Sequence, residues 1–401
     1  MNIPVKNCSS CMACMNVCAR GAVSVVQDFE GFYRPQIDSS LCVKCGACER
    51  TCPWNNIIVN PNGSEASPKT FAAFCNDETI RANSSSGGVF SVLANEVLAQ
   101  RGAVVGVGYK DSTHLEFKIV EDVSELHKLR LSKYFQTEVG LIYKYVKKLL
   151  LDGRTVLFSG TSCQIAALYA VLGKRNFEKL ITVDIVCHGV PSQKVFEKYI
   201  RELEMSGNKV INSNFRDKIS GWKKYSMTNI MDKKNGNNIQ RCSKILSEDL
   251  FMESFLDNLC LNTSCTECKY GVLPRIADIT LGDYWGVAKY HPEMDDDKGT
   301  SVVLINTTHG EELFNAAKIT AESTPTMTIC ESKLEYAIAG NPCIVRSSHV
   351  HENRDSFMAA LDSATLSELL KKFNPPPNIV YRVIRKIYRG FKKVAKNIIG
   401  K

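Results

Sequence analysis

The stretch CSSCMACMNVC at residues 8–18 returns as CVKCGACERTC at residues 42–52, with the same spacing of its cysteines. Each stretch reads C-x2-C-x2-C-x3-C. Two residues between thiolates let a short turn wrap three of them around one face of a 4Fe–4S cube, so the fourth ligand has to come from the other run. The duplicated spacing therefore predicts two 4Fe–4S clusters within residues 1–60.

The expected ligand sets are crossed between the two runs, as in a two-cluster bacterial ferredoxin. Cys52 precedes Pro53, as that pattern asks, whereas Cys18 precedes Ala19, a departure that removes no ligand. A disulfide framework or two zinc sites would fit eight duplicated ligands less well. Cluster one is predicted to use Cys8, Cys11, Cys14 and Cys52, and cluster two Cys42, Cys45, Cys48 and Cys18.

The composition is that of an ordinary globular protein, with 44% hydrophobic and 23% charged residues among 401. The sequence has no apolar run of about 18 residues that could span a membrane, and Met1–Lys6 has no hydrophobic core of a signal peptide. Seventeen cysteines without such a signal indicate a reducing cytoplasm. Four cysteines stand alone and are expected to be small buried hydrophobes: Cys75, Cys242, Cys330 and Cys343.

The formal net charge of +8 belongs to residues 379–401, which hold eight lysines and arginines and no acid. The rest of the chain is neutral, which argues against nucleic-acid binding. Residues 379–401 also place apolar side chains at helical spacing, and the prolines at 375–377 separate them from what precedes. This basic amphipathic helix is expected either to dock on the protein or an acidic partner, or to lie peripherally in a membrane interface.

The order of elements predicts an α/β fold. Residues 22–26 and 32–37 are expected strands of the ferredoxin unit, and a linker at 60–68 follows. Helices are expected from 84–88 to Gly102 and at 139–151, 164–172, 193–205 and 247–259. Strands are expected at 70–75, 103–109, 115–121, 155–159, 180–186, 277–281 and 300–306, with antiparallel strands at 209–245. Alternating strands and helices favour a mixed sheet covered by helices, with a helical or linker segment at 346–378.

Four further cysteines lie at places where ligands can converge. Cys163 and Cys187 each follow an expected strand, so neighbouring parallel strands would bring both to one carboxyl edge. Cys265 and Cys268 form a CxxC pair, with Cys260 as a reserve ligand. Their spacing is compatible with a third 4Fe–4S cluster, with a zinc site, or with unrelated core thiols; Cys163 alone could also be a redox nucleophile at a helix N-terminus.

Two loops are candidates for binding an anion. The Ser84–Gly88 loop opens a helix, where small residues and free N–H groups suit a phosphate, although a plain helix cap explains it equally well. Residues 298–301 could also hold a phosphate or make a turn. Lys133 could contact a flavin or substrate or be solvated, and His188 could carry protons or be structural.

Taken together, six motifs resemble the coenzyme F420 hydrogenase/dehydrogenase β-subunit family, over about residues 70–345. They are residues 83–90, 132–134, 160–164, 187–192, 265–270 and 277–283, continued by 299–301 and 306–307. The resemblance implies an FAD-binding α/β domain and a cluster held by Cys163, Cys187, Cys265 and Cys268. The residues then expected to bind the cofactor are Ser85, Ser86, Gly87, Gly88, Lys133, Thr161, Gln164, Gly299, Thr300, Ser301 and Asn306.

With the ferredoxin unit in front, the chain resembles a bacterial branch found among polysaccharide-synthesis proteins. The predicted function is an iron–sulfur flavoprotein oxidoreductase that passes electrons between 4Fe–4S clusters and FAD, and on to a redox partner protein or a small hydride acceptor or donor. Flavin suits this role because it takes single electrons and delivers a hydride. The alternatives are a flavin-free electron-transfer adaptor for a partner enzyme and a zinc-bearing transferase in glycan assembly. No catalytic residue is assigned.

Overall fold

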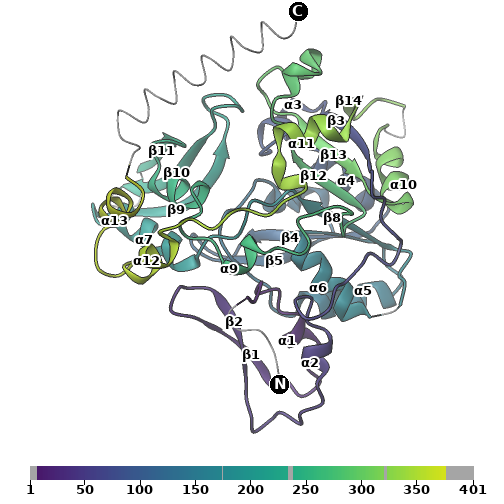
Figure 1. Ribbon diagram of the computed structural model, residues 1–401. Coiled ribbons are helices and arrows are strands. Elements are labelled where there is room, and N and C mark those ends of the chain that lie inside the picture. Colours follow the sequence, from purple (N-terminus) through teal and green to yellow (C-terminus); the bar gives the residue numbers. More distant parts are fainter. Residues whose placement is uncertain (1–6, 174, 234–237, 320–322, 376–401) are drawn as a thin grey trace, which may run out of the picture.

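The computed structural model describes residues 7–173, 175–233, 238–319 and 323–375, which form three sheets and their covering helices (Figure 1). The largest sheet has nine strands in the order β14-β3-β13-β12-β8-β7-β4-β5-β6. A three-stranded sheet and a two-stranded sheet accompany it. The mixed α/β architecture and the ferredoxin-type N-terminal unit predicted from the sequence are thereby confirmed.

The N-terminal unit shows its internal duplication in the backbone. Each cysteine run leads into a short helix, α1 (Ala13–Val17) or α2 (Ala47–Arg50), and between them β1 (Val23–Gln27) pairs antiparallel with β2 (Tyr33–Ile37). Met12 and Gly46 stand at the same place in the two runs and both have a left-handed φ, 56° and 71°. The two runs therefore make the same turn around their thiols.

The nine-stranded sheet is parallel at its centre. β4 (Ala103–Tyr109), β7 (Val156–Gly160), β8 (Leu180–Ile185) and β12 (Ile279–Asp283) run parallel to one another. β13 (Ser301–Ile305) is antiparallel to both β12 and β3 (Lys69–Cys75). Consequently the carboxyl ends of β3, β7, β8 and β12 and the amino end of β13 lie at one edge. The flanking strands are β14 (Met327–Ser332), β5 (Leu115–Val120) and β6 (Thr137–Glu138).

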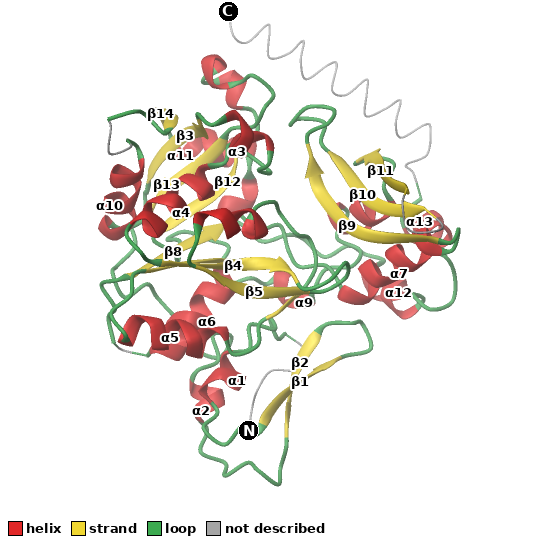
Figure 2. Cartoon of the chain, turned by 180° about the vertical axis from the view of Figure 1, so that it is seen from behind, coloured by secondary structure: helices red, strands yellow, loops and turns green. Residues whose placement is uncertain are grey.

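Helices cover both faces of this sheet. α4 (Val89–Ala99) and α10 (Thr308–Ala317) pack on one face, and α5 (Ile142–Leu151) and α6 (Ser162–Leu172) on the other (Figure 2). Strand β7 shows the alternation: Val156 and Phe158 face α5 and α6, whereas Leu157 faces α4. The strands are apolar on both sides because both faces are buried, as parallel sheets require.

A second core lies under the three-stranded antiparallel sheet of β9 (Asn208–Asp217), β10 (Ser226–Lys233) and β11 (Asn238–Ile245). Its aromatic centre is formed by Phe196, Phe215 and Phe251. The helices that contribute are α7 (Gln193–Glu204), α8 (Leu250–Leu256), α12 (Arg354–Ala359) and α13 (Leu366–Phe373). The last two helices occupy the segment expected to be helical or a linker.

The remaining elements are short and connect these layers. They are α3 (Glu78–Ala82), η1 (Val123–Leu129), α9 (Thr263–Thr266), η2 (Val287–Lys289), η3 (Pro292–Met294), α11 (Leu334–Gly340) and η4 (Pro342–Ile344). The strand β14, which pairs with β3, was not predicted. The predicted basic helix at 379–401 lies outside the described residues. No helix in the described part of the chain is long and apolar enough to cross a membrane.

Candidate functional site

The structure brings together the four cysteines expected around cluster one. Cys8, Cys11, Cys14 and Cys52 line one small cavity. Burial raises the pKa of the Cys14 thiol well above its ordinary value, and the neighbouring Cys11, Cys8 and Cys52 raise it further. As thiolates, these four groups would repel one another. The iron ions of a bound cluster would compensate their negative charge, so the four form a suitable ligand set.

The second set is closer to the surface. Cys18 packs with Cys48, and the pKa of the Cys48 thiol is raised by burial and by Cys45 and Cys18. Cys42 lines a surface hollow beside this pair, and Cys45 is exposed. Cys18, which ends the first run, therefore lies close enough to Cys48 of the second run to influence its pKa, and the crossed ligand set stays a prediction.

The third set lies at the carboxyl edge of the nine-stranded sheet. β7 and β8 are parallel neighbours, and Cys163 and Cys187 follow their carboxyl ends. Burial raises the pKa of Cys163 to about 12, and Cys268 and Cys187 contribute in the same direction. Burial likewise raises the pKa of Cys265 to about 12, with contributions from Cys163 and Cys268. The four thiols are thus close enough to interact.

Hydrogen bonds to the sulfurs fit a cluster at this place. The backbone N–H of Val190 donates to Cys265 Sγ at 3.3 Å, and Thr161 Oγ1 lies 3.1 Å from Cys163 Sγ. A similar hydrogen bond runs from Ser10 N to Cys8 Sγ in the first set, at 3.3 Å. Such bonds tune the potential of iron–sulfur clusters. The chemistry of this donor set suits a 4Fe–4S cluster.

The reserve ligand Cys260 is not part of the third set. It is fully buried in the core beneath the three-stranded sheet, and its Sγ lies 3.7 Å from Ser254 Oγ. Burial raises its pKa to about 12 without a contribution from another cysteine. Cys260 therefore behaves as a core thiol.

The first and third sets are adjacent. Cys11 belongs to the same hydrophobic cluster as Cys163 and Cys268, and Cys163 contributes to the raised pKa of Cys11. Helix α1 packs against α6 (Figure 1). Tyr143 and Tyr270 fix the contact, since their hydroxyls donate to Cys11 O at 3.0 Å and to Pro53 O at 2.9 Å.

The loops 84–88 and 299–301 meet at the same sheet edge. Gly87 N donates to Ser301 Oγ and Ser86 Oγ to Thr300 O, both at 3.0 Å. Ser132 N donates to Ser85 Oγ at 2.7 Å, which brings the segment of Lys133 to the same place. The predicted residues Ser85–Gly88, Lys133 and Gly299–Ser301 are therefore neighbours.

Packing explains two of the glycines in these loops. A Cβ on Gly87 would lie 2.5 Å from Ala73 O and 2.9 Å from Ser301 N. Gly299 has φ +108°, and a Cβ there would lie 2.6 Å from Ser86 O. Both positions thus demand glycine for close backbone packing, whether or not a phosphate binds.

Two half-buried lysines surround the loops. Lys133 Nζ donates to Arg130 O at 2.7 Å and to Leu131 O at 3.0 Å. Lys218 Nζ donates to Ser86 O and Lys298 O, both at 2.7 Å. Burial lowers the pKa of Lys133 to about 7 and that of Lys218 to about 8. Among the described residues, neither ammonium forms an ion pair with a carboxylate, so an anionic ligand would stabilise both.

Of the three cations near these loops, the sequence predicted Lys133 and missed both Lys218 and Arg216. Arg216, in β9, binds Asp283 with both guanidinium nitrogens, at 2.7 and 2.9 Å, and stacks on Tyr225. Its Nη2 also lies 3.4 Å from Ser85 O. Asp283 ends the 277–283 motif. Arg216 lies in β9 and Lys218 directly follows that strand, and neither belongs to a motif that the sequence could reveal.

Three predicted cofactor contacts are placed elsewhere. Thr161 and Gln164 form the capping box of α6, with Thr161 N donating to Gln164 Oε1 at 2.9 Å, beside the third cysteine set. Asn306 donates to Ala277 O at 3.0 Å and to Thr280 Oγ1 at 2.9 Å. Because it follows the opposite end of β13 from Ser301, it lies roughly 17 Å away from the loop cluster.

The isolated cysteines and His188 are now placed. Cys75 is buried as expected, but Cys242, Cys330 and Cys343 are only half-buried, so the prediction was wrong for these three. His188 Nε2 lies 2.7 Å from Asn258 Oδ1, and burial lowers its pKa. This favours the structural interpretation of His188.

Comparison with known proteins agrees with this arrangement. Residues 153–326 match the family that describes the C terminus of the "Coenzyme F420 hydrogenase/dehydrogenase, beta subunit", and residues 7–56 match the "4Fe-4S dicluster domain". The resemblance noted in the motifs is confirmed. The chain thus carries a 4Fe–4S dicluster domain, and residues 153–326 are related to the C terminus of that β subunit.

The curated relatives match a short part of the chain. "Ferredoxin-type protein NapF" of Escherichia coli K12 is 40% identical over 47 residues, which are 12% of this chain and 29% of the relative, and the protein of that name from Escherichia coli O157:H7 gives the same values. The chain spans under a third of these relatives. A chain of the F420-reducing NiFe hydrogenase complex from Methanosarcina barkeri aligns with 72% of this chain and 93% of its own, at a TM-score of 0.45 and 16% identity.

Proposed function

We propose that this chain, an iron–sulfur protein related to the β subunit of coenzyme F420 hydrogenase, is a flavin-dependent oxidoreductase. We assign residues 1–60 to the two-cluster ferredoxin domain and residues 70–345 to the redox domain. The observation that carries the proposal is a series of three cysteine sets and one further site. That site, the cationic loop, consists of residues 84–88 and 299–301 with Lys133, Arg216 and Lys218. Bound 4Fe–4S clusters would relay single electrons, and a bound FAD would couple them to hydride transfer.

The exposure and the contacts of these residues indicate the order of the sites in this series. Cys45 of the second set is exposed, and the apolar Leu41 and Val43 beside it are exposed too. A redox partner protein would therefore meet the chain at this end. The first set lies inward, and Cys11 faces the third set across the contact between α1 and α6.

The third set and the cationic loop share one sheet edge. Cys187 follows β8, and the neighbouring β12 ends at Asp283, which holds Arg216 beside Ser85. Aromatic side chains also connect the two sites. The ring centroids of His188 and Phe255 are 5.1 Å apart, and those of Phe255 and Tyr134 are 4.9 Å apart. Lys133 and Lys218 would neutralise the flavin pyrophosphate, while the serines hold the loop in shape.

Anaerobic purification followed by denaturation tests the proposal. We expect one FAD to be released per chain, and bound FAD to be bleached when the clusters are reduced with dithionite. A matched variant, Lys218→Met, should lower FAD occupancy and leave iron unchanged. A protein with full iron and no affinity for added FAD would contradict the proposal and favour the flavin-free adaptor.

A further inference from the structure

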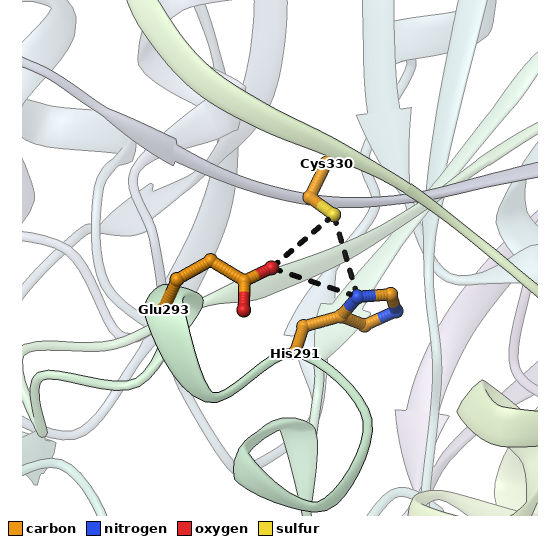
Figure 3. Close-up of side chains that lie close together, drawn as sticks. All are labelled: His291, Glu293 and Cys330. Carbon is orange, nitrogen blue, oxygen red and sulfur yellow. Dashed lines mark hydrogen bonds and ion pairs between the residues drawn. The ribbon is translucent and has the colours of Figure 1, made fainter.

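A histidine, a glutamate and a cysteine converge at the outer edge of the nine-stranded sheet (Figure 3). His291 and Glu293 belong to the loop that contains η2 and η3, and Cys330 to the edge strand β14. The loop and the strand are far apart in the sequence. None of the three residues belongs to the cysteine sets or to the cationic loop.

The three side chains point toward one another at separations that suit a metal ion. His291 Nδ1 lies 3.3 Å from Cys330 Sγ and 3.8 Å from Glu293 Oε1, and Cys330 Sγ lies 3.6 Å from Glu293 Oε1. In a tetrahedral zinc site, bonds of about 2.0–2.3 Å place ligand atoms about 3.3–3.7 Å apart. The observed triangle therefore needs little adjustment to hold zinc.

A further hydrogen bond orients the imidazole. His291 Nε2 lies 2.8 Å from Ser332 Oγ, and that hydroxyl lies 2.5 Å from Tyr284 OH. If Nε2 carries the proton, it donates to Ser332, and the lone pair of Nδ1 faces Cys330 and Glu293. Zinc-bound histidines are commonly fixed in this manner through their second nitrogen.

The charged groups at this place favour a metal-binding role for Cys330 over a role as a nucleophile. In the described part of the chain, Glu293 forms no ion pair with a lysine or arginine. A carboxylate that assisted a Cys–His nucleophile would bind the outer nitrogen of the imidazole, but here that nitrogen faces Ser332. Glu293 instead faces the sulfur, so the thiolate and the carboxylate both call for a positive charge between them.

We propose that His291 Nδ1, Glu293 Oε1 and Cys330 Sγ bind one zinc ion, with water as the fourth ligand. Thiolate, imidazole and carboxylate together are zinc ligands; on binding, the Cys330 thiol releases its proton to solvent. The ion would join the edge strand β14 to the 287–294 loop. The 287–294 loop supports the cationic loop, because Thr300 Oγ1 donates to Met294 O at 2.5 Å.

Zinc titration of the full chain under anaerobic conditions tests this proposal, with X-ray absorption at the zinc edge to identify the ligands. We expect one zinc per chain with one sulfur and three nitrogen or oxygen neighbours. Cys330→Ser and Glu293→Gln should weaken binding more than about 100-fold, and Ser332→Ala about 10- to 100-fold. Cys242→Ser, which changes another half-buried lone cysteine, is the matched control.

Two results would overturn the assignment. Zinc coordinated by sulfur alone would mean that it had entered an iron–sulfur site. Unchanged zinc affinity in Glu293→Gln, whose exposed side chain makes misfolding an inadequate explanation, would remove the site. Neither result bears on the proposed redox function, because iron and flavin contents are measured separately.

Discussion

At the scale of single residues, the two aspartates of the 277–283 motif have different roles although their side chains are identical. Asp278 is fully buried and accepts hydrogen bonds from Thr182 N and Thr307 Oγ1, at 2.8 Å each. Asp283, five residues later at the sheet edge, holds Arg216. Asp278 joins strands and loops, since a buried carboxylate must be fully bonded. Asp283 positions a cation at the candidate flavin site.

The lysine pKa values predict how flavin binding depends on pH. Without ligand, the pKa of Lys133 is lowered to about 7, so it is cationic below that pH and neutral above it. A bound pyrophosphate favours the cation, so FAD affinity should fall as the pH rises through 7, by at most about tenfold per pH unit. Lys218 should add a fall near pH 8.

Titration of the FAD affinity from pH 6 to 9 measures this dependence. Lys133→Met should remove the step near 7 and keep the step near 8, whereas Lys133→Arg should hold its charge and flatten the first step. An unchanged pH profile in Lys133→Met would show that this ammonium does not face the ligand.

The crossed ligand gives a second prediction at this scale. Cys18→Ser should damage cluster two, although Cys18 ends the first run, because Cys18 acts on the pKa of Cys48, whereas the neighbours that act on Cys14 are Cys11, Cys8 and Cys52. Paramagnetic resonance of the reduced protein reports each cluster. Cys14→Ser, the matched variant, should instead damage cluster one; the reverse pattern would refute the assignment.

At the scale of elements, the β8 strand and the loop before β12 hold the third cysteine set in place through one buried ion pair. Arg275 Nη2 donates to Asp184 Oδ2 at 2.7 Å and to Ser162 Oγ at 2.8 Å, and both charged side chains are inaccessible to solvent. Ser162 precedes Cys163, and Asp184 lies in the strand that leads to Cys187. The pair thus connects three of the segments that carry ligands.

Removing one partner should therefore be costly. Asp184→Asn leaves a buried guanidinium uncompensated, and we expect a loss of about 3–5 kcal/mol in the free energy of unfolding. Anaerobic denaturant unfolding measures it. Asp355→Asn removes an exposed carboxylate from Arg354, which keeps its two bonds to Glu30, so it should cost less than about 1 kcal/mol; equal losses in the two variants would contradict this account.

The elements also show what could be predicted from sequence. Strands β4 and β13 were predicted because they are short apolar runs bounded by turns, and the cysteine spacing predicted which thiols would meet. Strand β14 was missed because MTICES is a half-exposed edge strand without an apolar run. Arg216, Lys218 and the His291–Glu293–Cys330 triangle were missed because only the tertiary fold brings them to their partners.

The structure decides which substitutions near the 84–88 loop can test phosphate binding. Gly87→Asp, which from sequence alone would test phosphate binding, places its Cβ against Ala73 O. It would disturb the fold before any ligand bound. Lys218→Met is a better probe, since it removes an ammonium beside Ser86 O and adds no atom to the packed loop.

At the scale of the whole molecule, the ferredoxin unit is held against the redox domain on several sides. Arg354 in α12 binds Glu30 with both nitrogens, at 2.9 and 2.6 Å, while Asn262 Nδ2 donates to Cys8 O at 3.2 Å. Tyr143 and Tyr270 secure the face near Cys11. Such fixed docking gives the first and third cysteine sets a constant separation, which electron transfer between them requires.

The central claim is that a third cluster lies between the ferredoxin unit and the flavin site, and iron and sulfide analysis tests it most directly. The anaerobically purified protein should hold about twelve irons, and Cys265→Ala about eight. Cys260→Ala, which removes a buried cysteine outside the set, should keep about twelve. A Cys265→Ala protein that retains the iron and sulfide content of the unaltered chain would contradict the account.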